Sequence, residues 1–149
     1  MEATWSVAQG VGVGDRFLLL ELHARYAATI DEGDARGWAA CFMADGVLRT
    51  SRPLVVCGHE ALEAFAAEWH AGGPGQPRHM TWQHRFAAAP AGGGEVTGTC
   101  YAALLRTVAA RVDIAFTAVY HDRFVPAADG WRIRERVVAL DGARADVSD

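Results

Sequence analysis

The stretch AVYHDRFVPAADGWRIRERVV, residues 118–138, contains two strand-like runs separated by a turn signal, AADG at 127–130. Side chains alternate between the two sides of a strand, so residues of equal parity share a side. When the first run is continued back to residue 116, one of its sides carries three aromatic rings and one acid, at Phe116, Tyr120, Asp122 and Phe124. Such a row indicates a buried or interfacial face, and we expect the run to belong to a sheet with one covered side.

Strand-like character recurs elsewhere in the C-terminal half of the chain. Strands are predicted at about 78–88, 95–107, 111–126 and 131–140, and the turns PAGGGE and AADG separate two of the junctions clearly. The junction near Val108–Ala110 carries no turn signal. Two shorter strands, VLRTS and LVVCG, flank Arg52-Pro53.

The N-terminal half has helical periodicity instead. A helix is predicted from Asp15, because large side chains recur at helical spacing at Leu19, Leu22, Tyr26 and Ile30. Gly33 is its expected stop, and Asp34 is the expected N-cap of a short second helix, which MADG (43–46) should end in a turn. A third helix is predicted at 59–70, with one apolar stripe at Leu62, Phe65 and Trp69.

Helices first and antiparallel strands afterwards define the α+β class, with the helices packed on one face of the sheet. Strands of ten or more residues curl strongly, so we expect a cone-shaped α+β barrel. In it a strongly curved, mainly antiparallel sheet and about three helices enclose a pocket. The 149 residues suit a single domain. Its core is expected over about 15–140, with loose ends at 1–13 and 141–149.

Composition argues against several classes of function. The formal net charge is −4 and Lys and Arg form no dense run, so neither nucleic acid nor an anionic membrane is the expected partner. No apolar stretch approaches the roughly 18 residues of a transmembrane helix. RFLLLEL (16–22) is interrupted by Glu21, and we expect a cytoplasmic protein. The three cysteines are far apart, and we expect reduced, buried thiols at Cys41, Cys57 and Cys100.

The stretch QPRHMTWQH (76–84) reads as a strand with a polar row. Alternation puts its polar residues on one side and its apolar residues on the other: His79, Thr81 and Gln83 against Met80 and Trp82. A polar row on a strand faces either water or the inside of a pocket. In a pocket, a histidine can act as an acid and a base.

We expect no metal site and no cofactor. By the same alternation, His79 and His84 lie on opposite faces of the strand and cannot bind one ion. The chain has no CxxC or HExxH pattern, and Gly12 and Gly14 lie in no GxGxxG motif. Ser51 has no nucleophile elbow around it, which argues against nucleophilic catalysis.

Several segments together resemble the nuclear-transport-factor-2-like superfamily, and its SnoaL-like branch in particular. The resemblance is carried by LLLELHARYAATIDEGDARGWAACFMADGVL (18–48), GHEALEAFAAEWH (58–70), RHMTWQH (78–84) and AVYHDRFVPAADGWRIRERVV (118–138). It covers most of the chain from about residue 15 to 140 and implies the cone-shaped fold. That fold hosts dehydratases, isomerases, cyclases, epoxide hydrolases and non-catalytic subunits, so it does not select one function.

Within this branch the chain is similar to the scytalone-dehydratase-like lyases, which include bile-acid dehydratases and a dehydrochlorinase. In those enzymes an Asp at the end of the first helix and a His on the strand after the third helix act together as a base. Asp31 and His79 match these positions. A polar pocket residue five before the Asp corresponds to Tyr26, and an Arg in the final strand corresponds to Arg136. The resemblance thus implies that these four residues are catalytic.

The chain also departs from relatives within the superfamily. Ketosteroid isomerases share the tyrosine but need a carboxylate on the first strand, where this chain has RTSR (49–52). This difference argues against steroid isomerisation. Many SnoaL-like proteins carry Asn at the position of Gln83, and His121 is the nearby candidate for a second dehydratase-type histidine.

The last strand leaves two assignments open. Alternation places Arg136 on one face with Arg132 and Arg134, a row that suits either solvated charge or a clamp for a substrate oxygen. If the register shifts by one residue, Glu135 faces the pocket instead.

The favoured hypothesis is a cofactor-independent acid–base enzyme that acts on a small, mostly apolar organic molecule. Dehydration or a related elimination is the preferred reaction. His79 would act as base and acid, Asp31 would orient it, and Tyr26 and Arg136 would polarise the substrate oxygen. Further residues are expected to bind the substrate: Trp38, Trp69, Trp82, Gln83 and Tyr120.

Two alternatives remain open. A cyclase or isomerase of secondary metabolism would use the same residues, since these reactions also begin with proton abstraction beside a carbonyl. A non-catalytic ligand-binding protein or structural subunit would need neither His79 nor Asp31. In each case the resemblance implies a homodimer or higher homo-oligomer formed through the sheet.

Overall fold

The computed structural model describes residues 10–142. These residues form, in chain order, α1 (Val13–Glu32), α2 (Ala35–Ala39), β1 (Phe42–Thr50), β2 (Leu54–Cys57), α3 (His59–Gly72), β3 (Gln76–Ala88), β4 (Val96–Val108), β5 (Arg111–Ala127) and β6 (Gly130–Leu140). The predicted elements are therefore confirmed in kind and order. The expected loose ends fall largely outside the described residues, although α1 already begins at Val13.

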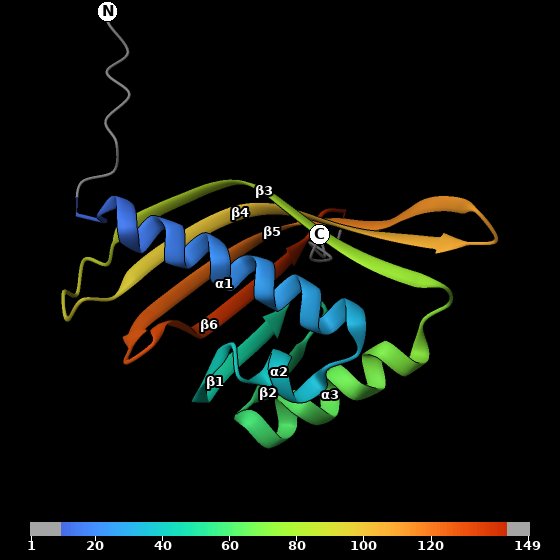
Figure 1. Cartoon of the computed structure of the whole chain (residues 1–149), viewed down its shortest axis with the longest axis horizontal. Helices are drawn as coiled ribbons and strands as arrows, with labels where there is room; N and C mark the ends of the chain where they lie inside the picture. The colour runs from blue at the N-terminus through green and yellow to red at the C-terminus, as the bar shows by residue number, and fades with distance from the viewer. Residues whose placement is uncertain (1–9, 143–149) are drawn as a thin grey trace, which may run out of the picture.

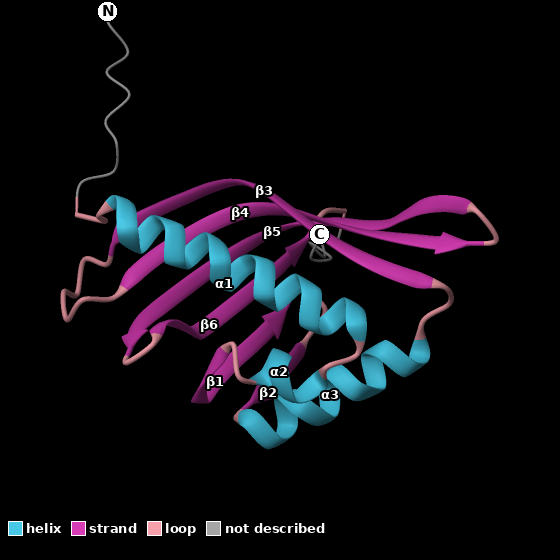
Figure 2. Ribbon diagram, in the orientation of Figure 1, coloured by secondary structure: helices cyan, strands magenta, loops and turns pink. Residues whose placement is uncertain are grey.

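The six strands of the described chain form one sheet, in the order β2-β1-β6-β5-β4-β3. The pairing of β1 with β6 is parallel and the other pairings are antiparallel. The three helices lie on one face of the curved sheet: α1 crosses its concave face, and α2 and α3 lie beside β1 and β2 (Figures 1 and 2). The predicted α+β cone is confirmed.

The core lies between α1 and the sheet. The predicted stripe of the first helix is buried, at Leu19, Leu22, Tyr26 and Ile30. Facing it, the largest fully buried side chains include Trp38, Phe42, Tyr120, Phe124 and Ile133. Burial of this apolar surface is what holds the helix on the sheet, at roughly 25 cal/mol for each Å² removed from water.

The end of α1 follows the predicted capping chemistry. Gly33 has a left-handed φ of 80°, which glycine adopts without steric strain. The carboxylate of Asp34 accepts a hydrogen bond from the N–H of Gly37 at 2.8 Å and caps α2. As a result α1 stops just after Asp31, whose side chain is buried in the last turn of the helix.

Two local predictions were wrong. Residues 43–46 do not form a turn after α2 but belong to β1, whose pairing with β6 is irregular between Phe42 and Val47. Cys57 is exposed rather than buried, because it lies at the end of the short edge strand β2, whereas Cys41 and Cys100 are buried. No helix in the described part of the chain is long and apolar enough to cross a membrane.

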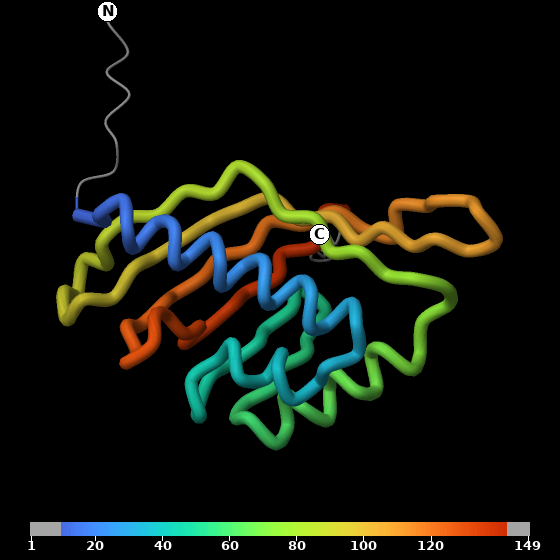
Figure 3. Tube along the Cα trace, viewed as in Figure 1, coloured from blue at the N-terminus to red at the C-terminus, as the bar shows by residue number. Residues whose placement is uncertain are grey.

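The junction between β4 and β5, for which the sequence carries no turn signal, is a tight hairpin turn. Ala109 (φ 46°) and Ala110 (φ 63°) both have positive φ, as in the type I′ turns that match the twist of paired strands. Alanine is unusual there, which is why the sequence carried no turn signal. The hairpin extends past the end of α3 (Figure 3).

Candidate active site

A pocket of about 420 Å³ is lined by residues of α1, α2, α3 and the sheet. Its walls are largely aromatic and aliphatic, with Trp38, Phe65, Trp69 and Phe116 among them. A few polar side chains interrupt these walls: Tyr26, Thr50, Arg52, His79 and Tyr120. An apolar pocket with a few placed polar groups is the usual form of a small-molecule site.

Asp31 and His79 form a buried pair at the wall of this pocket. Oδ1 of Asp31 accepts a hydrogen bond from Nδ1 of His79 at 2.6 Å, and Oδ2 accepts one from the backbone N–H of the same residue at 2.7 Å. Both side chains are less than a tenth exposed. Because an ionised carboxylate only accepts, Nδ1 carries the proton and the lone pair of the neutral ring lies at Nε2.

Two elements distant in the chain hold this pair. Asp31 lies in the last turn of α1 and His79 in the first half of β3, and the side-chain amide of Gln76 donates to the Asp31 carbonyl at 3.2 Å. The ring of His79 packs against Trp69 and Phe116, with centroids 5.0 and 6.4 Å away. An oriented imidazole among apolar rings can take a proton from a bound molecule and return it.

A second polar group lies directly behind the pocket wall. The guanidinium of Arg136 donates two hydrogen bonds to Asp122, at 2.7 and 2.8 Å, and both residues are buried. Its Cζ lies 4.2 Å from the ring centroid of Tyr26 and 4.4 Å from that of Tyr120. Arg136 thus contacts two tyrosines that line the pocket but is not itself part of the lining.

Burial dominates the ionisation of these groups. Burial raises the pKa of Tyr26 and raises that of Tyr120 by a larger amount. The positive charge of Arg136 lowers both pKa values but offsets only part of the effect of burial. Burial also opposes the charge of Arg136, but the Asp122 carboxylate outweighs it and keeps the pKa of the guanidinium above its ordinary value. The tyrosines are therefore neutral hydroxyl groups beside a permanent cation.

The structure places the predicted site residues in three settings. Asp31 and Arg136 lie one layer behind the pocket, each in contact with a residue that lines it. Trp82 and Gln83 are exposed and outside the pocket, so the prediction that they bind substrate there was wrong. The remaining predicted residues line the pocket: Tyr26, Trp38, Trp69, His79 and Tyr120.

Trp82 faces outward because it alternates with His79, and a β-bulge explains the error at Gln83. Its pairing with β4 shifts register between Trp82 and Arg85, and Gln83 has a positive φ of 56°. The bulge reverses the alternation of side chains beyond it. His84 therefore turns to the same side as His79, and the prediction that these two histidines lie on opposite faces was wrong.

A similar irregularity in β6 shows that the predicted row of arginines on one face was wrong. The pairing with β5 shifts register, with Arg134 as the extra residue. Arg136 turns inward beyond it, whereas Arg134 turns outward and lies 3.1 Å from Glu95, so these arginines do not share a face. Glu135 accepts a hydrogen bond from Arg49 at 2.6 Å on the surface and does not replace Arg136 inside.

Sequence reasoning missed His23 and gave Asp122 no role. His23 is buried, with Nε2 3.6 Å from Asp122 Oδ2 and Nδ1 3.3 Å from Nη2 of Arg136. The signal was present, since position 23 lies four residues after Leu19 and three before Tyr26, on the same helical stripe. His121, the nearby candidate for a second dehydratase-type histidine, is exposed.

The burial of His23 predicts how stability depends on pH. Burial, together with the charge of Arg136 and the neighbouring His84, holds the pKa of His23 well below its ordinary 6.5. Below pH 6.5 the unfolded chain therefore binds a proton that the folded chain does not. The free energy of unfolding should fall by about 1.4 kcal/mol for each pH unit in this range.

Urea unfolding of the wild type and of His23→Gln at several pH values between about 5 and 7 checks this expectation. The variant should lose less stability than the wild type as the pH falls. His121→Gln, which removes an exposed histidine, should keep the wild-type dependence. If the free energy of unfolding falls equally with pH in the wild type and in His23→Gln, His23 has the same pKa in the folded and the unfolded chain, and the expectation is wrong.

A curved, mainly antiparallel sheet, a helical cover and a pocket with a buried Asp–His pair define a cone-shaped α+β protein built around a largely apolar pocket. The chain belongs to the SnoaL-like domain family, whose model matches residues 14–137. The resemblance drawn from the sequence is confirmed at this level. No curated protein matches the chain significantly.

Several solved structures share the fold. An NTF2-like protein with a cystatin-like fold from Novosphingobium aromaticivorans is 23% identical, with a TM-score of 0.76 over 89% of this chain and 86% of that one. Aln2 from a Streptomyces species is 29% identical, with a TM-score of 0.77 over 87% and 93%. A Catenulispora acidiphila protein solved in complex with S-DNPA is 26% identical, with a TM-score of 0.78 over 87% and 96%.

Proposed function

We propose that the protein is a cofactor-independent acid–base enzyme acting on a small, mostly apolar organic molecule, with dehydration as its reaction. The observation that carries this proposal is the buried Asp31 carboxylate, bonded to both the ring and the backbone of His79 at the wall of an aromatic pocket. Burying a carboxylate is unfavourable unless it is paired. A histidine held in this way suits proton transfer better than packing alone.

In the proposed reaction, Nε2 of His79 accepts a proton from the carbon beside a substrate carbonyl. Asp31 stabilises the resulting imidazolium through Nδ1. The electron pair moves onto the carbonyl oxygen as an enolate, to which the Tyr26 hydroxyl donates a hydrogen bond. When the enolate collapses, the carbon–oxygen bond of the β-hydroxyl breaks and a carbon–carbon double bond forms. His79 returns the proton to the departing oxygen, which leaves as water.

Arg136 acts through Tyr26 in this scheme. Its guanidinium stacks on the Tyr26 ring at 4.2 Å and is locked by Asp122, so it is a positioning residue rather than a direct substrate ligand. The remaining predicted pocket residues, Trp38, Trp69 and Tyr120, would provide walls for an apolar substrate.

Solvent deuterium exchange tests the proposal. Small aromatic and aliphatic β-hydroxy ketones are incubated with the protein in D₂O and analysed by mass spectrometry. A dehydratase should release water and form an alkene. The alternative cyclase or isomerase should incorporate deuterium without losing water. If compounds that bind show neither exchange nor water loss, the acid–base proposal is refuted.

A non-catalytic ligand-binding protein is the second candidate, favoured by the apolar pocket and by the ligand held in the Catenulispora acidiphila relative. Ala115 is exposed yet lines the pocket, so Ala115→Trp should obstruct it with little effect on the core. We expect this variant to weaken binding by about tenfold or more, equivalent to about 1.4 kcal/mol. Calorimetry with a bound compound from the screen measures the effect, and unchanged affinity would place the ligand elsewhere.

A further inference from the structure

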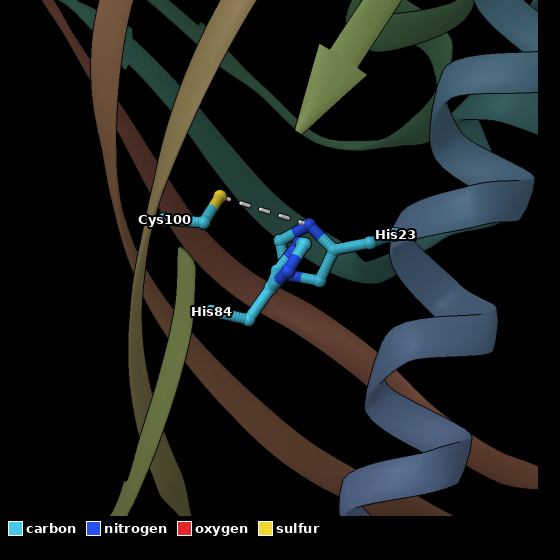
Figure 4. A group of neighbouring side chains, drawn as sticks. All are labelled: His23, His84 and Cys100. Atoms are coloured by element: carbon cyan, nitrogen blue, oxygen red, sulfur yellow. Dashed lines mark hydrogen bonds between the residues drawn. The ribbon is translucent and has the colours of Figure 1, made fainter. Parts of the chain in front are cut away.

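A second cluster of side chains lies next to Arg136 and outside the pocket. His23 comes from α1, His84 from β3 and Cys100 from β4, and the three side chains point toward one another (Figure 4). The Cys100 sulfur lies 4.0 Å from Nδ1 of His23, and the two imidazole centroids are 4.6 Å apart. One nitrogen or sulfur atom from each residue lies within 4.8 Å of the others. None of the three residues lines the pocket.

The backbone of β3 is bent in a way that brings His84 into this cluster. Gln83 has a φ of 56°, a conformation that is strained for a residue other than glycine. Without the bulge, alternation would turn His84 to the outer face. Its ring is held by a hydrogen bond between Nε2 and the Thr81 hydroxyl, at 3.2 Å. The proposed acid–base reaction makes no use of His84, so the pocket does not explain this placement.

The orientation of the His23 ring suits a metal ligand. Nε2 of His23 faces Asp122, at 3.6 Å, while Nδ1 faces Cys100. Metal-binding histidines usually present their second nitrogen to a carboxylate in this way, which orients the ring.

The gap between His23 and Cys100 fits one ion. Metal–nitrogen and metal–sulfur bonds of about 2.0 and 2.3 Å span this gap of 4.0 Å with an angle of about 135° at the metal. A shift of a few tenths of an ångström between these two atoms gives the 120° angle of a trigonal site. Two imidazoles and a thiolate form a soft ligand set, which favours copper or zinc over magnesium or calcium.

The charge of the cluster distinguishes between these two metals. Nη2 of Arg136 lies 3.3 Å from His23 Nδ1, so an additional positive charge in this buried place is unfavourable. A thiolate together with a monovalent ion carries no net charge, whereas the same thiolate with Zn²⁺ carries one positive charge.

We propose that His23, His84 and Cys100 bind one Cu(I) ion. On binding, the S–H bond of Cys100 breaks, a sulfur–copper bond forms and the proton leaves to solvent, with no change in the oxidation state of the metal. The two neutral imidazoles complete a trigonal site that ties α1 to β3 and β4.

An anaerobic Cu(I) titration with bicinchoninate as a coloured competitor tests this site. Cys57→Ser serves as the background, because the exposed Cys57 thiol would itself bind copper. We expect one Cu(I) per chain and weaker binding of Zn²⁺. Adding Cys100→Ser or His84→Gln should weaken Cu(I) binding by more than about 100-fold, beyond the usual effect of losing an outer-shell partner. Adding Cys41→Ser, which removes a buried thiol outside the cluster, should leave the affinity unchanged.

A second measurement needs no variant of the cluster itself. X-ray absorption of the Cu(I)-loaded background protein should show one sulfur and two nitrogen neighbours. The imidazole ¹⁵N signals of His23 and His84 should move on loading, while those of His79 stay in place. Cu(I) binding that persists in Cys100→Ser, depends on Cys41, is weaker than Zn²⁺ binding or lacks nitrogen neighbours would overturn the proposal.

Discussion

Glutamine in place of His79 is expected to lower kcat/KM by about 10²- to 10⁴-fold, the usual contribution of a positioned acid–base group. The glutamine amide can still donate a hydrogen bond to Asp31, so the fold should persist. It has no nitrogen that accepts a proton from carbon, so the chemical step should fail. Initial rates on a compound identified by deuterium exchange measure the effect, and circular dichroism checks the fold.

Two further variants test the same prediction: one is expected to lose activity and the other is a control expected to keep it. Asp31→Asn removes the charge that stabilises the imidazolium and the acceptor that selects its tautomer, so a loss of similar order is expected. His121→Gln removes an exposed histidine on the same sheet and should leave the rate unchanged. If His79→Gln turns over like the wild type, the acid–base role is refuted and the ligand-binding alternative is favoured.

Methionine in place of Arg136 is expected to lower the free energy of unfolding by about 3–5 kcal/mol. The variant leaves the Asp122 carboxylate buried without its two hydrogen bonds, at 2.7 and 2.8 Å in the wild type. It also removes the cation between the rings of Tyr26 and Tyr120. Guanidinium chloride unfolding followed by tryptophan fluorescence measures the loss.

A double variant separates the buried charge from the lost packing. Arg136→Met with Asp122→Leu leaves no unpaired charge, so most of the stability should return. Arg111→Met serves as the control, because its partner Asp113 is exposed and such surface pairs contribute little. A loss for Arg136→Met no greater than that for Arg111→Met would show that the buried pair is not a stability determinant.

Periodicity alone was enough to predict most of the fold. The repeat of Leu19, Leu22, Tyr26 and Ile30 reflects a helix packed on one side, and the structure buries all four. Gly33 and Asp34 end one helix and begin the next through local chemistry that needs no tertiary contact. The hairpin turn at Ala109–Ala110 was not marked, because its positive φ values are imposed by the paired strands rather than favoured by alanine.

The candidate site depended on a different kind of information. Asp31 and His79 are 48 residues apart, and by local pattern Asp31 is an ordinary helix-end acid. The resemblance to a family suggested the pair, and the structure shows the two hydrogen bonds between them. The position of Arg136 behind Tyr26 was not foreseen, because it depends on the extra residue in β6.

The sequence by itself determined the element order, the α+β class and the core stripe of the first helix, since each follows from residue spacing within one segment. The tertiary structure alone decided which side chains of the long strands face inward beyond a bulge. Alternation is strict only while every residue pairs, and the extra residues at Gln83 and Arg134 reverse it. Whether a strand bulges depends on its neighbours in the sheet, so the inward turn of His84 and Arg136 could be seen only once the strands were paired.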